Sequence, residues 1–238
     1  MEFEIVKTNI VNVNADAIVL PANSELKEGS GASAAIFEAA GRRKLTQACK
    51  KLGHCEVGSA VPTLAFDLDA KYIIHAVVPK WIDGTHEEYD LLSSAYLESL
   101  TLAEVMGCQT IAFPLLASGN NGFDLELAFE IAQKNIELFS GIHLKKVYIV
   151  IYGDHITAIM REKGYSIIEI PANLRKQEQK EAHKAKAKEL AEEGKEVALK
   201  FMEDQIGKAL KYLEDKENRE KVIKYAKKIV QIVIQSRK

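Results

Sequence analysis

The chain has 238 residues, 47% hydrophobic and 28% charged, a composition typical of a folded protein with a sizeable core. No run approaches the roughly eighteen uninterrupted apolar residues of a membrane-spanning helix. The first residues, MEFEIVKTNIVNV, lack the basic start and apolar centre of a signal peptide. The three cysteines, Cys49, Cys55 and Cys108, follow no metal-ligand spacing. We therefore expect a cytoplasmic protein with buried thiols, no metal site, no cofactor and no membrane partner.

Charge is divided unevenly along the chain. Residues 172–238 hold 18 Lys and Arg and 12 Asp and Glu, a net charge of +6. Residues 1–171 hold 14 basic and 22 acidic residues, a net charge of −8. An acidic body with a mildly basic tail disfavours nucleic acid as the partner.

Residues 1–170 alternate between strand-like and helix-like segments. Clusters of Ile, Val and aromatic residues predict strands at 3–7, 17–21, 72–77, 110–116, 146–152 and 166–170. Helical apolar spacing predicts helices at 33–41, 42–52, 90–106, 125–139 and 156–163. Asp124 and Asp154 are the expected N-caps of the last two helices. This alternation predicts a three-layer α/β/α domain around a mixed, mostly parallel sheet.

The character of the sequence changes after Pro171. Lys, Glu and Ala dominate, and apolar residues recur at helical spacing around 199–213 and again at 222–234. We predict two domains, 1–171 and a charged all-helical extension at 172–238 that forms a helical hairpin. Its apolar stripes must be buried, either on the chain's own body or against a second copy or another protein.

The segment from Asp16 to Gly41 carries most of the functional information. An apolar strand pattern ends at Pro21-Ala22-Asn23, and a loop of small residues, 29–33, opens directly into a helical pattern. A strand, a glycine loop and a helix start let backbone N–H groups converge on an anion, usually a phosphate.

Four ordered motifs extend this pattern: DAIVLPAN (16–23), GSGASAAIFEAAG (29–41), AKYIIHAVVPKW (70–81) and IAFPLLASGNNGF (111–123). Together they resemble the macro domain, an α/β fold that binds ADP-ribose. The resemblance covers residues 1–170. It implies that two loops clasp the diphosphate and distal ribose, and that the ligand is ADP-ribose or an ADP-ribosylated protein.

The resemblance also assigns individual residues. The first clasp would be Gly29, Ser30, Gly31, Ala32 and Ser33, and the second Ser118, Gly119, Asn120, Asn121 and Gly122. Asn23 would hydrogen-bond the distal ribose, Phe123 would pack near it, and Asn9 with Ile10 would hold the adenine. Small residues suit both clasps because a side chain would keep the diphosphate away from the backbone N–H groups.

The chain departs from the family pattern at four positions. Asn9 replaces the adenine-binding aspartate, Leu20 replaces an asparagine, and Asn121 replaces an aromatic residue of the second clasp. Ser33 stands where hydrolytic members place the aspartate that orients water. A serine hydroxyl at its ordinary pKa is no general base, so these changes preserve phosphate binding and weaken the case for hydrolysis.

Several of these residues also have a purely structural interpretation. Asn23 could cap a turn, residues 120–122 and the glycines could only form turns, and Ser33 could be the N-cap of a helix starting at Ala34. His75 lies within an apolar strand pattern, where we expect a core histidine. Trp81 is expected to be a packing anchor after the same strand.

Three functional hypotheses follow. The first is an ADP-ribose-binding module. The second is an enzyme that removes ADP-ribose from a modified side chain, or processes O-acetyl-ADP-ribose or ADP-ribose 1″-phosphate, with a water held near Asn23. Asn23 and Ser33 are its candidate catalytic residues. The third is a non-binding scaffold whose helical tail binds a partner.

Overall fold

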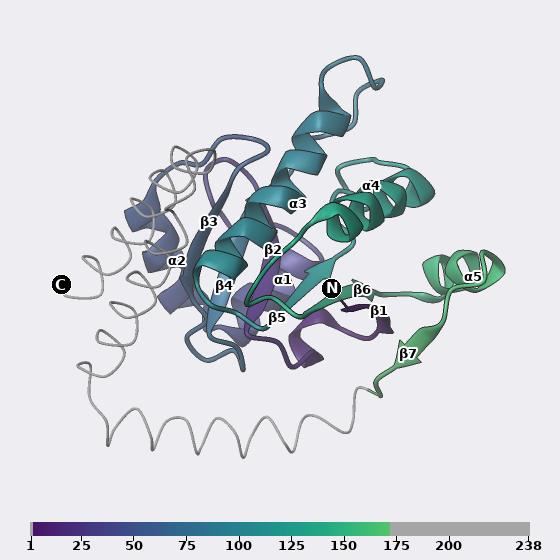
Figure 1. The fold of residues 1–238 in the computed structure, drawn as a ribbon. Coiled ribbons are helices and arrows are strands. Elements are labelled where there is room, and N and C mark those ends of the chain that lie inside the picture. The colour runs from purple at the N-terminus through teal and green to yellow at the C-terminus, as the bar shows by residue number, and fades with distance from the viewer. Residues whose placement is uncertain (1, 172–238) are drawn as a thin grey trace.

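The structure, a computed structural model, describes residues 2–171. The predicted helical extension at 172–238 therefore lies outside the described residues. A seven-stranded sheet forms the centre of the fold, with strand order β3-β4-β2-β5-β6-β1-β7. Its strands are β1 (Glu2–Lys7), β2 (Ala17–Ala22), β3 (Ala60–Leu64), β4 (Tyr72–Val77), β5 (Thr110–Pro114), β6 (Lys146–Ile151) and β7 (Ile167–Glu169). Figure 1 shows this sheet between two groups of helices.

Every strand pairing is parallel except that of β3 with β4. The mixed, mostly parallel sheet is the one predicted. The sequence analysis missed β3, an edge strand of five residues that contains Pro62. A proline cannot donate a ladder hydrogen bond and is tolerated at a sheet edge, so the short AVPTL run gives a weak strand signal.

Five α-helices and one 3₁₀ turn connect the strands. They are η1 (Ile10–Asn12), α1 (Ala32–Ala39), α2 (Arg42–Leu52), α3 (Glu88–Val105), α4 (Leu125–Leu138) and α5 (Asp154–Glu162). Asp124 is the N-cap of α4, as predicted, because its Oδ1 accepts the N–H groups of Glu126 and Leu127. The prediction for Asp154 is wrong: Gly153 is the N-cap of α5, and the Asp154 carboxylate instead pairs with Lys7 at 2.8 Å.

Two apolar cores cover the two faces of the sheet. Alternate residues of β2 serve opposite faces: Val19 belongs to the core that includes residues of α3, α4 and α5, whereas Ile18 belongs to the core that includes residues of α1 and α2. Since both faces are covered, the central strands are continuous apolar runs. The three-layer α/β/α architecture is confirmed. None of the described helices has the length and apolar character that a bilayer crossing requires.

The remaining structural expectations also hold. Cys49, Cys55 and Cys108 are buried, and within residues 2–171 they form no disulfide. His75 is fully buried, with Nε2 3.0 Å from the Thr63 hydroxyl, and burial lowers its pKa to about 3. Trp81 contacts the rings of Tyr89 and Phe123 edge-on, at centroid distances of 5.4 and 5.1 Å.

Candidate functional site

A cavity of about 790 Å³ lies at the carboxyl ends of the central parallel strands. Segments that follow β2, β4, β5 and β6 line it, together with the start of α1. Parallel α/β sheets place ligands at this edge because loops from neighbouring strands meet there. Its volume lies within the usual range for small-molecule sites, about 300–1,000 Å³.

The first predicted clasp lines this cavity with all five of its residues, Gly29 to Ser33. Gly31 is the N-cap of α1 and adopts φ +59° and ψ −125°, a conformation that favours glycine. The N–H groups of Gly31 and Ala32 have no hydrogen-bond partner within the described chain. The positive end of α1 and these free donors therefore face the same space.

Ser33 is buried, with 3% of its surface exposed. Its hydroxyl accepts a hydrogen bond of 3.0 Å from the N–H of Gly29, so it fixes the shape of the loop from within. It is not the N-cap of α1, because the helix already begins at Ala32. None of the described contacts of Ser33 involves a basic group that could activate the hydroxyl.

The second clasp contributes Ser118, Gly119, Asn120 and Asn121 to the lining. The preceding Ala117 has φ +62°, and the Gly122 N–H closes the turn by donating to the Gly119 carbonyl at 2.9 Å. Within residues 2–171, the N–H groups of Ser118, Gly119 and Asn120 make no hydrogen bond. A second set of unpaired backbone donors therefore borders the cavity.

The two clasps touch one another. The Asn120 side-chain amide donates to the Ser30 hydroxyl at 2.8 Å, which joins residues 90 positions apart. Asn121 links the second clasp to the segment after β4. Its side-chain amide donates to the Pro79 carbonyl at 2.9 Å, and its main-chain carbonyl accepts from the Trp81 N–H at 2.7 Å. Asn121 thus has a structural role in holding the loop, beside any contact with a ligand.

Asn23 also lines the cavity, but both ends of its side chain are engaged. Its Oδ1 accepts the Lys27 N–H at 3.1 Å and its Nδ2 donates to the Lys27 carbonyl at 2.9 Å. The turn-capping interpretation of Asn23 is therefore correct for this structure. Asn23 remains exposed, so its amide can still offer a further hydrogen bond.

Four predicted site residues do not line the cavity: Asn9, Ile10, Gly122 and Phe123. Phe123 is buried against Trp81. Asn9 is the N-cap of η1, where its Oδ1 accepts the Val11 N–H, and Ile10 is buried in the core beneath α1. Both follow β1, which pairs with β6, so they lie on the β6 side of the site.

The sequence analysis missed a lining segment, residues 150–156, which ends β6 and begins α5. It includes Tyr152, whose surface is 81% exposed, and His155. Tyr152 is the only Phe, Tyr or Trp among the described residues that line the cavity. The apolar run VYIVIY followed by Gly153 marks a strand end and could have flagged this segment.

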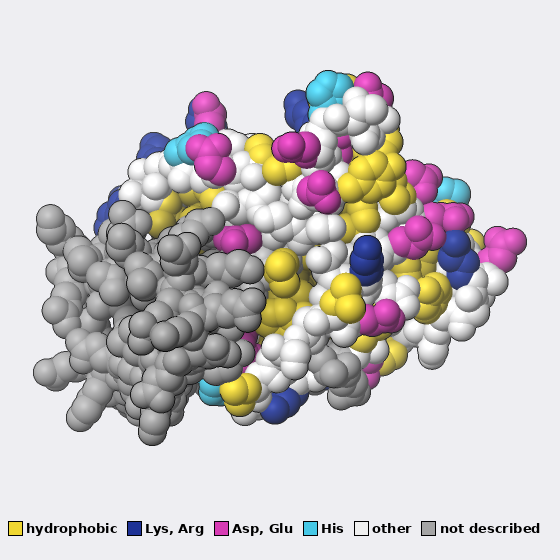
Figure 2. Space-filling model, turned by 45° about the horizontal axis from the view of Figure 1, so that its top comes forward, with side chains coloured by type: hydrophobic (Ala, Val, Ile, Leu, Met, Phe, Trp, Pro, Cys, Tyr) yellow, Lys and Arg dark blue, Asp and Glu magenta, His cyan; other side chains and the backbone are white. Residues whose placement is uncertain are grey.

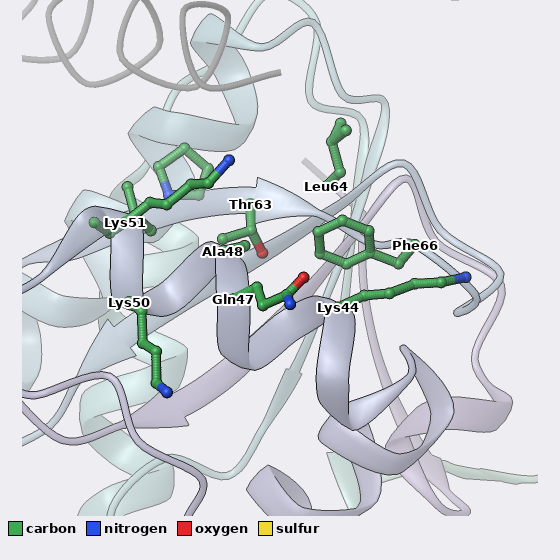
Figure 3. A pocket seen from close by; sticks show the side chains of 10 residues that line it. Lys44, Gln47, Ala48, Lys50, Lys51, Thr63, Leu64 and Phe66 are labelled. Carbon is green, nitrogen blue, oxygen red and sulfur yellow. The ribbon is translucent and has the colours of Figure 1, made fainter. Parts of the chain in front are cut away.

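A second cavity of about 700 Å³ lies between α2 and the edge strand β3. Its lining includes Lys44, Lys51, Thr63 and Phe66, and Figure 3 shows Lys50 extending away from the strand. It has no glycine loop and no parallel strand ends. We therefore assign the functional site to the cavity between the clasps.

Asp83, His86 and Glu88 place three potential metal ligands within 4.8 Å of one another, the one such group in residues 2–171. Glu88 is buried, and its carboxylate accepts N–H bonds from Ile82, Asp83, Gly84 and His86. Burial raises the pKa of Glu88, but these donors outweigh burial and lower it to about 2. The cluster is a hydrogen-bonded cap for the loop before α3.

The acidic balance of the body is visible on its surface. On the face shown in Figure 2, Asp and Glu side chains are spread among apolar and neutral ones, and no continuous basic patch is visible. This agrees with the net charge of −8 for residues 1–171.

Comparisons with known proteins all indicate the same family. A sequence model described as Macro domain matches residues 19–132. A macro domain-containing protein of Caldanaerobacter subterraneus is 43% identical over 157 residues, 64% of this chain and 90% of that protein. A protein of Escherichia fergusonii named O-acetyl-ADP-ribose deacetylase is 41% identical over 156 residues, which are 63% of this chain and 88% of that protein.

Solved structures agree. The Oceanobacillus iheyensis macrodomain with ADP superimposes with a TM-score of 0.64 and 30% identity, over 68% of this chain and 88% of that one. The Trypanosoma brucei macrodomain in complex with ADP-ribose gives a TM-score of 0.60 and 25% identity, over 68% of this chain and 69% of that one. The order of strands and clasps, and these relatives, together establish that the chain belongs to the macro domain family.

Proposed function

We propose that this protein binds ADP-ribose, free or attached to a protein, in the cavity between its two clasps. The observation that carries the proposal is the meeting of two sets of unpaired backbone N–H groups, at Gly31–Ala32 and Ser118–Asn120, across one cavity. Such donors suit a diphosphate, since they supply directed hydrogen bonds without a metal or a lysine. Similar macrodomains have been solved with ADP and with ADP-ribose.

Calorimetry of the full chain with ADP-ribose, ADP and AMP tests this proposal. We expect ADP-ribose to bind clearly more tightly than AMP, because only ADP-ribose reaches both clasps and the distal ribose position. Equal affinity for the three compounds would limit the site to a mononucleotide. Absence of heat with all three would contradict the proposal and favour the scaffold hypothesis.

A second candidate, hydrolysis of an ADP-ribose ester or glycoside, is favoured by the relative named O-acetyl-ADP-ribose deacetylase. Water would then be positioned by Asn23 and the ligand's own diphosphate, because Ser33 is a hydrogen-bonded loop residue and no base. We favour binding over hydrolysis for this chain on that ground.

Ser33→Asp separates the two candidates. The new carboxylate replaces a hydroxyl beside the Gly29 N–H, so it can keep that hydrogen bond and also orient water. If the native chain is a binding module, release of acetate from O-acetyl-ADP-ribose should be undetectable in the native protein and measurable in the variant. Turnover by the native chain would instead establish a hydrolase, and Ser33→Ala should then retain it.

A further inference from the structure

The loop between β4 and α3 exposes apolar side chains. Ile82 is 62% exposed, and Tyr89, at the start of α3, is 42% exposed. Trp81 connects Tyr89 to the core, because its ring contacts both Tyr89 and the buried Phe123. We call Trp81, Ile82 and Tyr89 the rim surface. Figure 1 shows their loop extending beyond the N-terminal end of α3.

This loop is held in one conformation. The buried Glu88 carboxylate accepts four of its backbone N–H groups, at 2.6 to 3.2 Å. Gly84 has φ +87°, and a Cβ there would lie 3.0 Å from the Trp81 ring and 3.1 Å from the Tyr89 ring. The rings and the backbone therefore pack closely. A surface that is ordered before binding loses little conformational entropy when a partner packs on it.

The rim surface adjoins the clasp cavity. Lys80 lines the cavity, and Trp81 follows it directly. The Trp81 N–H donates to the main-chain carbonyl of Asn121, in the second clasp, at 2.7 Å. The Val78 N–H donates to the Ala22 carbonyl at 3.3 Å, and both of these residues also line the cavity. The rim surface therefore borders the site on its β4 side.

This position distinguishes a free nucleotide from one attached to a protein, if the proposed function holds. A nucleotide inside the cavity needs no contact with Ile82 or Tyr89, since neither side chain lines it. A protein attached to that nucleotide lies outside the cavity and rests against the surface around it. Removing exposed apolar side chains from water there stabilises the complex.

Acidic side chains surround the rim surface. Asp83, Glu87 and Asp90 are exposed, and residues 81–90 contain no Lys or Arg. We infer that the rim surface docks the protein that carries ADP-ribose, and that it fits a segment in which an aliphatic residue is flanked by Lys or Arg. The aliphatic side chain packs on the apolar residues, and the basic side chains face the carboxylates. Complementary charge of this kind selects the partner.

Calorimetry of the full chain with peptides that carry one ADP-ribose in a non-hydrolysable linkage tests this inference. The native protein should bind a peptide with Leu and Lys beside the modified residue about tenfold more tightly than free ADP-ribose. Burial of one large aliphatic side chain has an effect of this size. A matched peptide with Glu in place of Lys should lose the preference, because its carboxylates meet those of the loop.

Variants of exposed isoleucines assign the preference to the rim surface. Ile82→Ser should remove most of it and leave the affinity for free ADP-ribose unchanged, because Ile82 does not line the cavity. Ile142→Ser is the matched control and should keep the full preference. Ile142 is 56% exposed and precedes β6, at the amino end of that strand, whereas the cavity lies at the carboxyl ends.

The measurement with free ADP-ribose keeps the two proposals distinct. If free ADP-ribose does not bind, the proposed function fails and this inference fails with it. If free ADP-ribose binds and the Leu-Lys peptide binds no more tightly, only the docking inference is wrong. A preference that survives Ile82→Ser, or one that favours the Glu peptide, also overturns it. So does an equal loss for peptide and free ADP-ribose in Ile82→Ser, because that side chain would then support the cavity.

Discussion

Gly31 shows how far one residue controls the site. Its backbone has φ +59°, and a side chain added there would meet no atom within 4 Å, because it would project into the open cavity. Gly31→Glu should therefore fold and yet lower ADP-ribose affinity by at least about a hundredfold, since a carboxylate would stand where the diphosphate belongs. Titration calorimetry measures this loss.

Gly53→Glu is the matched control for that experiment. Gly53 ends α2, has φ +80° and likewise meets no atom within 4 Å, but it does not line the clasp cavity. Both positions have a positive φ outside the left-handed helical region, so both variants carry backbone strain of about 1–3 kcal/mol and their melting temperatures should fall alike. Retained binding in Gly31→Glu would show that the anion lies elsewhere.

The sequence predicted the clasps because a glycine loop before a helix has a local signature. It did not predict that Tyr152 and Lys80 line the cavity, because each reaches the site only when β6 and β4 take their places beside β5 and β2. Such neighbours are set by long-range pairing, which spacing along the chain does not encode. The sequence analysis gave turn capping by Asn23 only as an alternative. The structure shows its partner, since both ends of the Asn23 side-chain amide bond to the Lys27 backbone.

At the scale of elements, two buried carboxylates fix loops between secondary structures. Glu88 caps the loop before α3, and Glu104 accepts the N–H groups of Ile142, His143 and Leu144 before β6. Burial raises the pKa of Glu104, but the donors from Leu144, His143 and Ile142 outweigh burial and hold that pKa below its usual 4.5. The sequence did not predict either role, because Glu88 binds an irregular loop and Glu104 binds a segment that is distant along the chain.

These carboxylates predict an acid-sensitive fold. A lowered pKa in the folded state means that the unfolded chain binds more protons than the folded chain below about pH 4.5. The free energy of unfolding therefore decreases as the pH falls through this range. For Glu88 the loss continues down to its pKa of about 2. Glu104→Gln should cost about 2 kcal/mol at pH 7, because an amide cannot accept all of these N–H bonds.

Urea unfolding between pH 3 and pH 7 measures both effects. Between pH 7 and pH 3 the free energy of unfolding should decrease less in the Glu104→Gln variant than in the native protein. Glu162→Gln, at an exposed position on α5, is the control and should unfold like the native chain. Equal pH slopes in native protein and Glu104→Gln would mean that the Glu104 carboxylate carries no linked stability.

At the scale of the molecule, the described residues already contain two complete cores and every residue assigned to the site. The last described strand, β7, closes the sheet beyond β1 with Ile5 opposite Ile167. We propose that 1–171 is an independent domain. A chain ending at Pro171 should unfold cooperatively and bind ADP-ribose within about twofold of the full chain, since distant, independent parts contribute additively.

Light scattering on both chains then tests what residues 172–238 do. If the full chain is an oligomer and the shorter one a monomer with unchanged binding, the extension serves assembly, because its apolar stripes find their partner in a second copy. If both are monomers and the shorter chain is less stable, the extension packs on its own body. An insoluble or non-binding shorter chain would contradict the boundary at Pro171, because the site would then depend on residues beyond it.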